Sequence, residues 1–502
     1  MHEDTGTVAT DAPVRADART WLGLVVLACA VLLIAVDATV LDLALPFISA
    51  DLAPTGVQLL WIIDVYSFAV AGLLVTMGVL GDRIGRRRLL IAGAVGFAAA
   101  SALAAWAVSP EMLIAARVLQ GIAGATLMPA TLGLIRHMFA DARQRTLAIG
   151  VWSAMAAGGA AAGPLVGGWL LEHFWWGSVF LVNLPIMAIL VFAAPRLIPE
   201  SRDPAPGRFD LVGALASLAA VLPLVYAIKE SALHGLQPEY LLVGGVGVLA
   251  ALFFVHRQRT TSSPLLDLSL FAERAFSTAV AANLLSVFAL AGVLFFGSQY
   301  LQLVLDVSPL TAGLLMLPGT AASAIGSLAA GPLTRRLPVG AVLACSLAAA
   351  AAGAAALLAL GAEGGAGVFV AGFAVVGAGV GVSMTLTTDL VVAAAPPDRA
   401  GAASAVSETA YELGLALGVA VLGSVVSATY QGRLAELFPS SEGLDTLGNL
   451  VETARHLPDT AARALLVEGR EAFVAGMHSA SAATAVILAV TALFAWRMLR
   501  RP

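Results

Sequence analysis

Four carboxylates lie within long apolar stretches of the sequence. Asp37 and Asp64 occupy the first two stretches, and Glu408 and Glu412 share a stretch near the C-terminus. A charged side chain at the centre of a bilayer costs at least about 2.5 kcal/mol on insertion scales, so such residues are functional candidates by default. A carboxylate in this position can bind a proton or the charge of a cationic ligand.

The spacing of Glu408 and Glu412 places both side chains on one face of a helix, one turn apart. Two like charges in a low dielectric repel each other and resist desolvation, so we expect at least one to carry a proton near neutral pH. Such a group can exchange its proton for a cationic ligand. The alternative is a structural role, in which protonated carboxyls bond neighbouring helices, and it weighs more for Asp64 and Glu412.

Other polar and aromatic residues accompany these acids. Arg117 lies inside an apolar stretch and needs a carboxylate or carbonyl partner, because snorkelling reaches only part of that depth. The aromatic side chains of Tyr66, Trp152 and Tyr411 could receive flat cations through cation–π contacts. Each of them is as compatible with helix packing.

The composition identifies the elements that position these residues. The chain has 502 residues, of which 59% are apolar and 12% charged, whereas soluble proteins carry about 25% charge. Apolar runs of about 18–25 residues predict membrane-spanning helices. They cover 21–46, 58–80, 89–108, 111–135, 146–171, 177–196, 209–228, 240–256, 276–303, 309–331, 338–360, 366–388, 400–429 and 473–497. The predicted fold is an all-α polytopic membrane protein with fourteen transmembrane helices.

Loop charges predict the orientation of these spans. Arginines gather in alternate loops, such as 83–88 and 335–336, and the positive-inside rule assigns those loops to the cytoplasm. We therefore expect both termini to be cytoplasmic, with residues 1–20 forming a tail. The segment 430–472 would lie outside, where apolar spacings on both sides of Pro458 predict a helical hairpin.

A glycine-rich stretch in the fifth span predicts close helix contact. It contains Gly159, Gly163, Gly167 and Gly168, together with Pro164. Small residues let helix backbones approach each other, and a proline removes a donor and bends a helix. A thin, bent helix suits an interface that must rock.

The turn after the second span combines glycines with charges. Gly78 and Gly85 flank Asp82 and Arg83, and Arg86 follows directly. A carboxylate at a span end can pair with an arginine or with a helix N-terminus. We therefore expect Asp82, Arg83 and Arg86 to form a cytoplasmic latch.

These segments together resemble the major facilitator superfamily, in particular its fourteen-span drug:proton antiporter branch. The resemblance rests on the segments 37–46, 78–88, 113–124, 159–168 and 405–414. The 159–168 stretch is similar to the antiporter motif of that branch, and 405–414 resembles the quaternary-ammonium and ethidium efflux pumps of bacteria. Asp42 stands where asparagine is commoner in the branch, so no role is carried onto it.

The resemblance implies a fold of two six-helix bundles related by a pseudo-twofold axis. The bundles would be residues 21–196 and 276–497, with residues 209–256 forming two inserted linker helices. Rocking of the bundles about a midplane cavity would give alternating access. In this scheme Arg117 is a structural or proton-relay partner, and the glycines of the 78–85 turn and the fifth span serve gating.

The implied function is proton-coupled efflux of lipophilic cations from a monomer in a bacterial plasma membrane. Asp37, Asp64, Glu408 and Glu412 would couple protons, and the two glutamates would also bind substrate. The energy source would be the proton gradient, with no cofactor and no metal. In some of these pumps the tenth span carries an acid used for divalent cations; here 311–319 has none, so we expect monovalent cations to be handled better.

Three rival functions remain to be weighed. One is a proton-driven self-resistance exporter of a neutral or anionic metabolite, against which the buried acids weigh. An uptake symporter conflicts with the antiporter motif. The third is a membrane-embedded enzyme or a passive channel. An enzyme is not expected, because no metal spacing or nucleophile–base arrangement occurs, and Cys29 and Cys345 lie in apolar runs. A channel would not need titratable acids in two separate bundles. No basic face remains for nucleic acid once the membrane-flanking arginines are set aside.

Overall fold

The computed structural model describes residues 16–54, 56–202, 210–261, 264–266, 268–396, 400–437 and 447–499. All secondary structure in these ranges is helical, as expected in hydrocarbon, where a helix satisfies its own backbone polar groups. The described residues include 14 helices long and apolar enough to cross a membrane. The predicted all-α architecture and the predicted number of spans are therefore confirmed.

The first group of helices surrounds one apolar core. It comprises α1 (Ala18–Leu52), α2 (Gly56–Ile84), α3 (Arg86–Ala105), α4 (Pro110–Met138), α5 (Ala142–His173), α6 (Ser178–Leu181) and α7 (Asn183–Leu197). Leu27, Phe97 and Leu134 are fully buried at the centre of this core. The sixth span, predicted as one helix, is broken at Val182 into α6 and α7. Pro185 has no N–H to donate to the carbonyl of Leu181, so the regular bonding is interrupted there.

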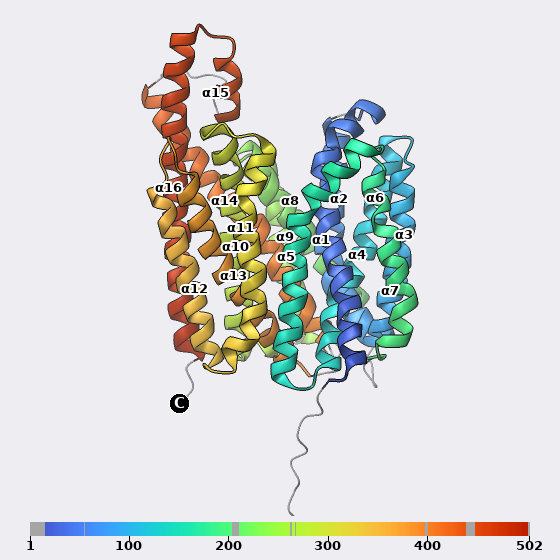
Figure 1. Cartoon of the computed structure of the whole chain (residues 1–502). Helices are drawn as coiled ribbons and strands as arrows, with labels where there is room; N and C mark the ends of the chain where they lie inside the picture. The colour runs from blue at the N-terminus through green and yellow to red at the C-terminus, as the bar shows by residue number, and fades with distance from the viewer. Residues whose placement is uncertain are drawn as a thin grey trace, which may run out of the picture.

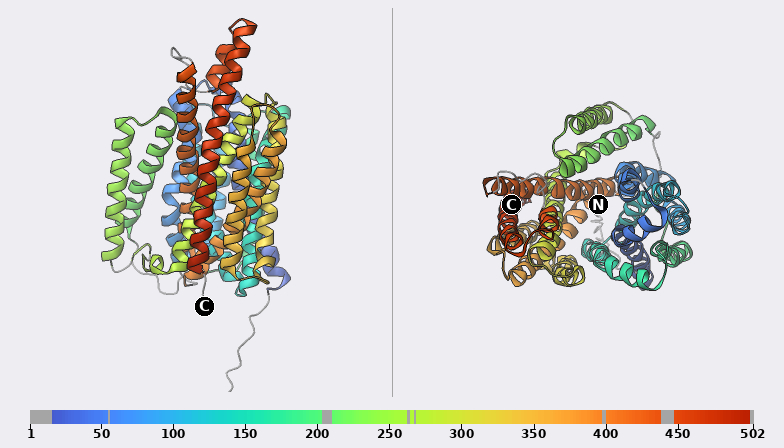
Figure 2. Two further views of the ribbon diagram at one scale, coloured as in Figure 1. Left: turned by 90° about the vertical axis from the view of Figure 1, so that its left-hand side faces the viewer. Right: turned by 90° about the horizontal axis from the view of Figure 1, so that it is seen from above.

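The second group lies beside the first (Figures 1 and 2). It comprises η1 (Leu268–Ala272), α10 (Arg274–Gln299), the π-turn η2 (Tyr300–Val304), α11 (Pro309–Thr334), α12 (Val339–Ala356), η3 (Leu357–Ala359), α13 (Ala366–Ala394), α14 (Ala400–Leu437), α15 (Leu447–Ala454) and α16 (Asp459–Leu499). Tyr300, Phe369 and Phe373 anchor its core.

Two helices lie between the groups in sequence and on one side of them in space (Figure 2). α8 (Leu211–His234) and α9 (Pro238–Thr260) pack on each other, and α8 also contacts α2 and α14. Asp210 receives the N–H of Gly213 at the start of α8 and pairs with Arg257 of α9 at 2.7 Å. α8 therefore touches both groups, whereas most of α9 is exposed.

In the segment expected as a helical hairpin, 430–472, described helices lie on both sides of Pro458, and the flanking spans also extend into the segment. α14 runs to Leu437, α16 begins at Asp459, and α15 packs on α16. The 41 residues of α16 correspond to about 60 Å at helical rise, twice the hydrocarbon thickness of about 30 Å. This end of the molecule projects beyond the other spans (Figure 1) and is called the α15 end. The opposite end, which carries the turn between α2 and α3, is called the α2–α3 end.

The two groups meet most closely toward the α2–α3 end. A Cβ on Gly78 would lie 2.6 Å from the carbonyl oxygen of Gly401, and one on Gly150 would lie 2.5 Å from that of Ser327. Only glycine permits these approaches of α2 to α14 and of α5 to α11. The ribbons of the two groups diverge toward the α15 end (Figure 1).

Candidate proton and substrate site

A buried ion pair joins α1 to α4. Asp37 is 1% exposed, and its Oδ2 lies 3.0 Å from Nη1 of Arg117, which is 2% exposed. The guanidinium also donates through Nε to the carbonyl of Ile62 on α2, at 3.3 Å. Arg117 thus has both a carboxylate and a carbonyl partner. Each charge at this depth is neutralised by the other, which lowers the cost of burying them.

Three neutral side chains close a ring around this pair. Nη1 of Arg117 donates to Oε1 of Gln120 at 3.2 Å, and Nε2 of Gln120 donates to Oγ of Ser101 at 2.9 Å. Nδ2 of Asn183 donates to the same Oγ at 3.1 Å and to Oδ1 of Asp37 at 2.6 Å. We call these five residues the polar ring. They come from α1, α3, α4 and α7, so proton binding at Asp37 would act on four helices at once.

Tyr66 of α2 covers one side of the polar ring. The guanidinium carbon of Arg117 lies 4.5 Å from the centroid of the Tyr66 ring, a cation–π distance. The aromatic face proposed for a drug cation is therefore occupied by Arg117 in this conformation. Glu412 of α14 lies within electrostatic range of Tyr66, so the two groups of helices face each other at this level.

The glycines of α5 bring that helix against the turn of α1 that carries Asp37. A Cβ on Gly159 would collide with the carbonyl oxygen of Leu32, and one on Gly163 would collide with Oγ1 of Thr39. These two glycines therefore explain the close packing of α5 on α1. Gly168 has open space around it, and Gly167 is buried.

The second pair of acids lies on α14. Glu408 is 5% exposed, and Tyr411 and Glu412 are half-buried. Beside Glu408, the hydroxyl and carbonyl of Ser407 accept bonds from Nδ2 of Asn283 at 3.2 and 3.0 Å. The acids of α14 thus border a polar patch inside the second group, separate from the polar ring of the first.

Asp82 forms the expected contacts at the α2–α3 end. Its Oδ1 lies 2.7 Å from Nε of Arg86, which is fully buried and also donates to Ser201 Oγ at 2.8 Å. The carboxylate also accepts the backbone N–H of Gly401 at 3.2 Å and of Ala402 at 3.1 Å, at the start of α14. A carboxylate is favourable at a helix N-terminus, so Asp82 ties the first group to the second. Arg83 is half-buried beside it.

Gly85 is needed for the turn that positions Arg86. Its φ of +111° lies in the region that favours glycine, and a Cβ there would lie 2.7 Å from the carboxyl of Glu200. Glu200 accepts the N–H of Arg87 at 3.0 Å. The tight turn between α2 and α3 is therefore held from the chain after α7.

A second connection between the groups was not among the predicted site residues. Nε of Arg145 on α5 lies 2.6 Å from Oδ1 of Asp389 on α13, and Oγ1 of Thr146 donates to Oδ2 at 2.5 Å. Asp389 lies near the end of its span, where the sequence predicts an ordinary solvated carboxylate. Asn183 and Ser101 were also missed, because a neutral polar residue in a span gives no comparable signal, whereas Gln120 belongs to the 113–124 segment of the family resemblance.

Some predicted residues lie outside the site or outside the described side chains. The side chains of Asp64 and Pro164 are not among those described, although α2 and α5 run through both positions. Trp152 is 4% exposed in the core of the first group, and its Nε1 donates to Oγ1 of Thr131 at 3.1 Å. Within the described residues, no group of three His, Cys, Asp or Glu side chains could hold a metal ion.

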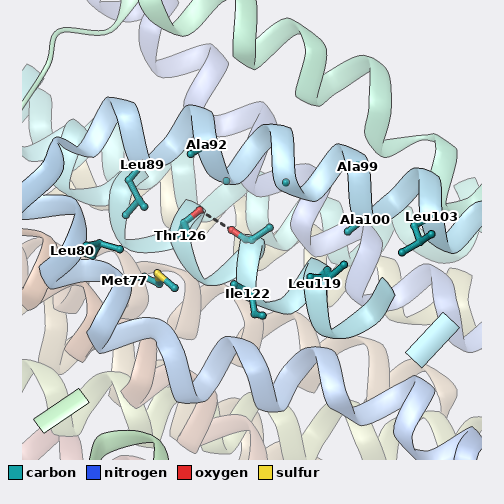
Figure 3. Close-up of a pocket in the computed structure, with 13 residues that line it drawn as sticks. Met77, Leu80, Leu89, Ala92, Ala99, Ala100, Leu103, Leu119, Ile122 and Thr126 are labelled. Carbon is teal, nitrogen blue, oxygen red and sulfur yellow. Dashed lines mark hydrogen bonds between the residues drawn. The ribbon is translucent and has the colours of Figure 1, made fainter. Parts of the chain in front are cut away.

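An open groove of about 590 Å³ runs between α2, α3 and α4. Its rim includes Leu119, which is 49% exposed, and Leu103, which is 36% exposed. The one hydroxyl lining it, on Thr126, donates to the carbonyl of Ala123 (Figure 3). The groove contains none of the buried charges, so it is separate from the polar ring.

The residues and the helical arrangement match one known family. The sequence profile of the Major Facilitator Superfamily matches residues 27–419, more than half of the chain. The chain belongs to the major facilitator superfamily. It is therefore a polytopic membrane transporter rather than an enzyme.

Relatives within the superfamily are similar over nearly their full lengths. The chain is 46% identical over 491 residues to the multidrug efflux pump LfrA of Mycolicibacterium smegmatis, covering 97% of each protein. It is 36% identical to the methyl viologen resistance protein SmvA of Salmonella typhimurium, covering 95% of this chain and 98% of that protein. It is 31% identical to the tetracenomycin C resistance and export protein of Streptomyces glaucescens, covering 98% and 95%.

Solved transporters share the fold. The human organic anion transporter MFSD10 (TETRAN) superposes with a TM-score of 0.59 at 15% identity, covering 95% of this chain and 98% of that chain. A bacterial homologue of the human lysosomal transporter Spinster superposes with a TM-score of 0.54 at 19% identity, covering 97% and 98%. At these identities the similarity concerns the fold alone.

Proposed function

We propose that this protein is a proton-coupled multidrug efflux antiporter of a bacterial plasma membrane. It exports lipophilic, mainly monovalent cations, such as quaternary ammonium compounds and dyes, by alternating access. The observation that carries the proposal is the placement of a buried acid in each group of helices, Asp37 in the polar ring and Glu408 on α14, with the half-buried Glu412 one turn from Glu408. The relatives named for multidrug efflux and drug resistance support the same function.

The two acid sites suit different parts of an exchange cycle. Asp37 is compensated by Arg117 at 3.0 Å, so a proton that binds Asp37 leaves the guanidinium charge without its counter-charge. Glu408 of α14 is 5% exposed and lies one helical turn from Glu412, so a cationic drug that binds there would offset the repulsion between the two acids. The helices α14 and α2, which carry Glu412 and Tyr66, pack on each other, so the two sites are joined through a contact between the groups.

The contacts at the α2–α3 end favour assignment of this conformation to the state open toward the outside. Asp82 binds the start of α14, and Arg145 binds Asp389, both between the two groups. The return to a state open toward the cytoplasm would break these contacts. Because the α2–α3 end carries Arg83 and its neighbouring arginines, the positive-inside rule places it in the cytoplasm.

The test is ethidium transport by the purified protein in liposomes with an imposed pH gradient. If one proton exchanges for one monovalent cation, each pH unit supports about a tenfold accumulation, because one pH unit equals about 1.36 kcal/mol. We expect gradient-driven ethidium movement with proton counterflow, lost in Asp37→Asn and Glu408→Gln. Asp141→Asn is the matched control, because asparagine caps a helix as well as the Asp141 carboxylate that receives the N–H of Gln144. Ethidium movement that ignores the pH gradient would refute proton coupling.

The divalent cation methyl viologen is the informative second substrate. The absence of an acid in 311–319 leads us to expect better transport of ethidium than of methyl viologen. A relative at 36% identity is named for methyl viologen resistance, so the comparison is a demanding one. Transport of methyl viologen alone would overturn the expected preference for monovalent cations.

Export of a neutral or anionic metabolite is the second candidate. A relative named for tetracenomycin C export supports it. Against an anion, Arg117 is already neutralised by Asp37, which leaves little positive charge to attract one. A wild-type protein that ignores ethidium and related cations in every gradient direction would make this candidate the leading one.

A further inference from the structure

The bonding of Asn183 differs from that of an ordinary buried amide. Asn183 is fully buried, and both hydrogens of its Nδ2 are used, toward Asp37 at 2.6 Å and Ser101 at 3.1 Å. Its Oδ1 is buried and has no hydrogen-bond partner among the residues that the structure describes. A buried acceptor without a partner costs about 1–3 kcal/mol, so its retention beside Asp37 needs an explanation.

Ser101 has a complementary irregularity. In the described structure its hydroxyl oxygen accepts two bonds, from Asn183 and from Gln120 at 2.9 Å, and donates none. A hydroxyl carries one donor and two acceptor sites, so its hydrogen is available. The polar ring therefore contains one unused acceptor and one unused donor on neighbouring residues.

Protonation of Asp37 gives a partner both to the unused acceptor and to the unused donor. The carboxyl then has a hydrogen to donate, and the NH₂ group facing it becomes a clash of two donors. A half-turn of the amide places Oδ1 where Nδ2 was, 2.6 Å from Asp37 and 3.1 Å from Ser101. In that position Oδ1 accepts from the carboxyl and from the Ser101 hydroxyl, while Gln120 still donates to Ser101. The other carboxyl oxygen keeps its bond from Arg117. The turned Nδ2 takes the former place of Oδ1, where the described residues offer it no partner, so the number of bonds in the polar ring stays the same and the unpartnered group changes from acceptor to donor.

We propose that Asn183 is a positioning residue for proton binding at Asp37, and that its amide turns over when the carboxylate is protonated. The bonding geometry of the polar ring carries this inference, which rests on the proposed role of Asp37 in proton coupling. Asn183 follows the break between α6 and α7 at Val182. The turn of the amide thus couples the protonation of Asp37 on α1 to α7 and, through Ser101, to α3.

The other charged groups near Asp37 do not perform this role. Arg117 of α4 donates in both states, Tyr66 of α2 faces the guanidinium, and Glu412 of α14 is in range of Tyr66. Asp64 is on α2, with a side chain outside those described. The charged residues of α5 and α7, such as Arg145 and Arg196, are at helix ends. Asn183 is thus the residue of the ring that can either donate to Asp37 or accept from it.

The test follows the protonation of Asp37 in the purified protein by infrared difference spectroscopy. The band of its protonated carboxyl is identified by subtracting Asp37→Asn, and its amplitude is followed against pH. In Asn183→Leu the charged carboxylate loses a donor, so we expect the midpoint to move about one to two units toward higher pH. The C=O band of the protonated acid also moves, because its acceptor is gone. In Asn183→Ser, whose hydroxyl can donate or accept, both properties return most of the way to wild type.

Asn283→Leu is the matched control. It removes a second buried amide, bonded to Ser407 in the other group of helices, and leaves the Asp37 band unmoved. If Asn183→Leu does not fold, Asn183→Asp keeps the shape and shifts the midpoint further toward higher pH, because the two carboxyls share a proton. An unmoved Asp37 midpoint in the folded variant overturns the inference. The titration uses no substrate, so a failure of proton-coupled transport would appear separately, in the liposome assay on wild type.

Discussion

The ion pair between Arg145 and Asp389 makes a specific prediction about conformational balance. Asp389→Asn keeps the shape of the side chain and removes its charge, so the contact between α5 and α13 weakens. The two side chains are only 9% and 13% exposed, so solvent screens them little. We expect the α2–α3 end to open more often in this variant.

The size of the effect follows from the bonds that are lost. The carboxylate accepts from Arg145 at 2.6 Å and from Thr146 at 2.5 Å. Bonds to a charged group contribute about 1.5–3 kcal/mol each, and the asparagine retains one acceptor. A net loss of about 2 kcal/mol changes the ratio of closed to open states about 30-fold, because about 1.4 kcal/mol is a factor of ten.

The assay is a distance measurement between spin labels across the α2–α3 end. Cysteines at the exposed positions His137 and Leu337 carry the labels, in a protein without Cys29 and Cys345. We expect double electron–electron resonance to show a longer-distance population in Asp389→Asn. The exchange of charges in Arg145→Asp with Asp389→Arg should restore the short distance.

The test of the Arg145–Asp389 pair has one control and one outcome that would refute it. Asp306→Asn removes a carboxylate beyond the end of η2 and should leave the distances unchanged, since asparagine tolerates the positive φ of 56° there. Identical distance distributions in wild type and Asp389→Asn, with the protein folded, would refute the assignment of this pair as a lock between the groups.

Three further predictions concern a close contact, an acid and an ion pair. Gly150→Val places side-chain carbons against the carbonyl oxygen of Ser327, which lies 2.5 Å from the added Cβ. Because overpacking costs about 1–3 kcal/mol and would keep α5 and α11 apart, we expect the transport rate to fall at least about tenfold. Initial rates of transport measure this change. Glu408→Gln should retain downhill movement of a bound dye but lose its dependence on the pH gradient, as measured by paired dye and proton fluxes. Burial raises the pKa of Asp210, but bonds from Arg257 and from a backbone N–H lower it more, so that pKa lies below the ordinary 3.8. Its contribution to stability is therefore present above pH 3.8 and is lost as pH falls through the lowered pKa, so the unfolding temperatures of wild type and Asp210→Asn should differ at neutral pH and converge in acid.

Each of these has an outcome that contradicts it. Normal transport by Gly150→Val would mean that α5 and α11 do not close to the observed distance during the cycle, and Gly168→Val, at a position with open space, provides the comparison. Unchanged proton flux in Glu408→Gln would remove that residue from coupling. A stability difference for Asp210→Asn that persists at pH 2 would assign the effect to something other than the ion pair, because asparagine still caps α8.

The fold was largely readable from the sequence because one physical constraint dominates it. Hydrocarbon allows a backbone to cross only as a helix or closed barrel, so apolar runs of sufficient length identify the spans. The exception at Val182 arose from local chemistry, since Pro185 removes one bond within a run that is apolar throughout. The extensions of α14 and α16 into 430–472 were also missed, because amphipathic helix beyond a membrane has no hydropathy signal that distinguishes it from a separate hairpin.

The candidate site was readable only in part, for a different reason. A charged residue within a long apolar run is recognisable in the sequence, so Asp37 and Arg117 were identified, and Arg117 was expected to need a partner. Which acid would meet it depends on tertiary packing across 80 residues. Neutral residues such as Asn183 and Ser101 cost little to bury once bonded, so no pattern marks them in advance. Asp389 was missed because its contact with Arg145 joins residues 244 positions apart in the sequence. Sequence alone does not show that the two charges are buried together.

The glycine contacts between the two groups also limit how this transporter can evolve under selection by inhibitors. At Gly78, Gly150 and Gly401 an added Cβ would collide with an atom across the interface, and every replacement of glycine adds at least that carbon. A compound that binds between these surfaces would contact glycines that no other amino acid can replace without a collision. A resistance substitution at one of these glycines would prevent the two groups from closing and so would inactivate the pump. The side chains around a bound drug, by contrast, can be replaced one at a time.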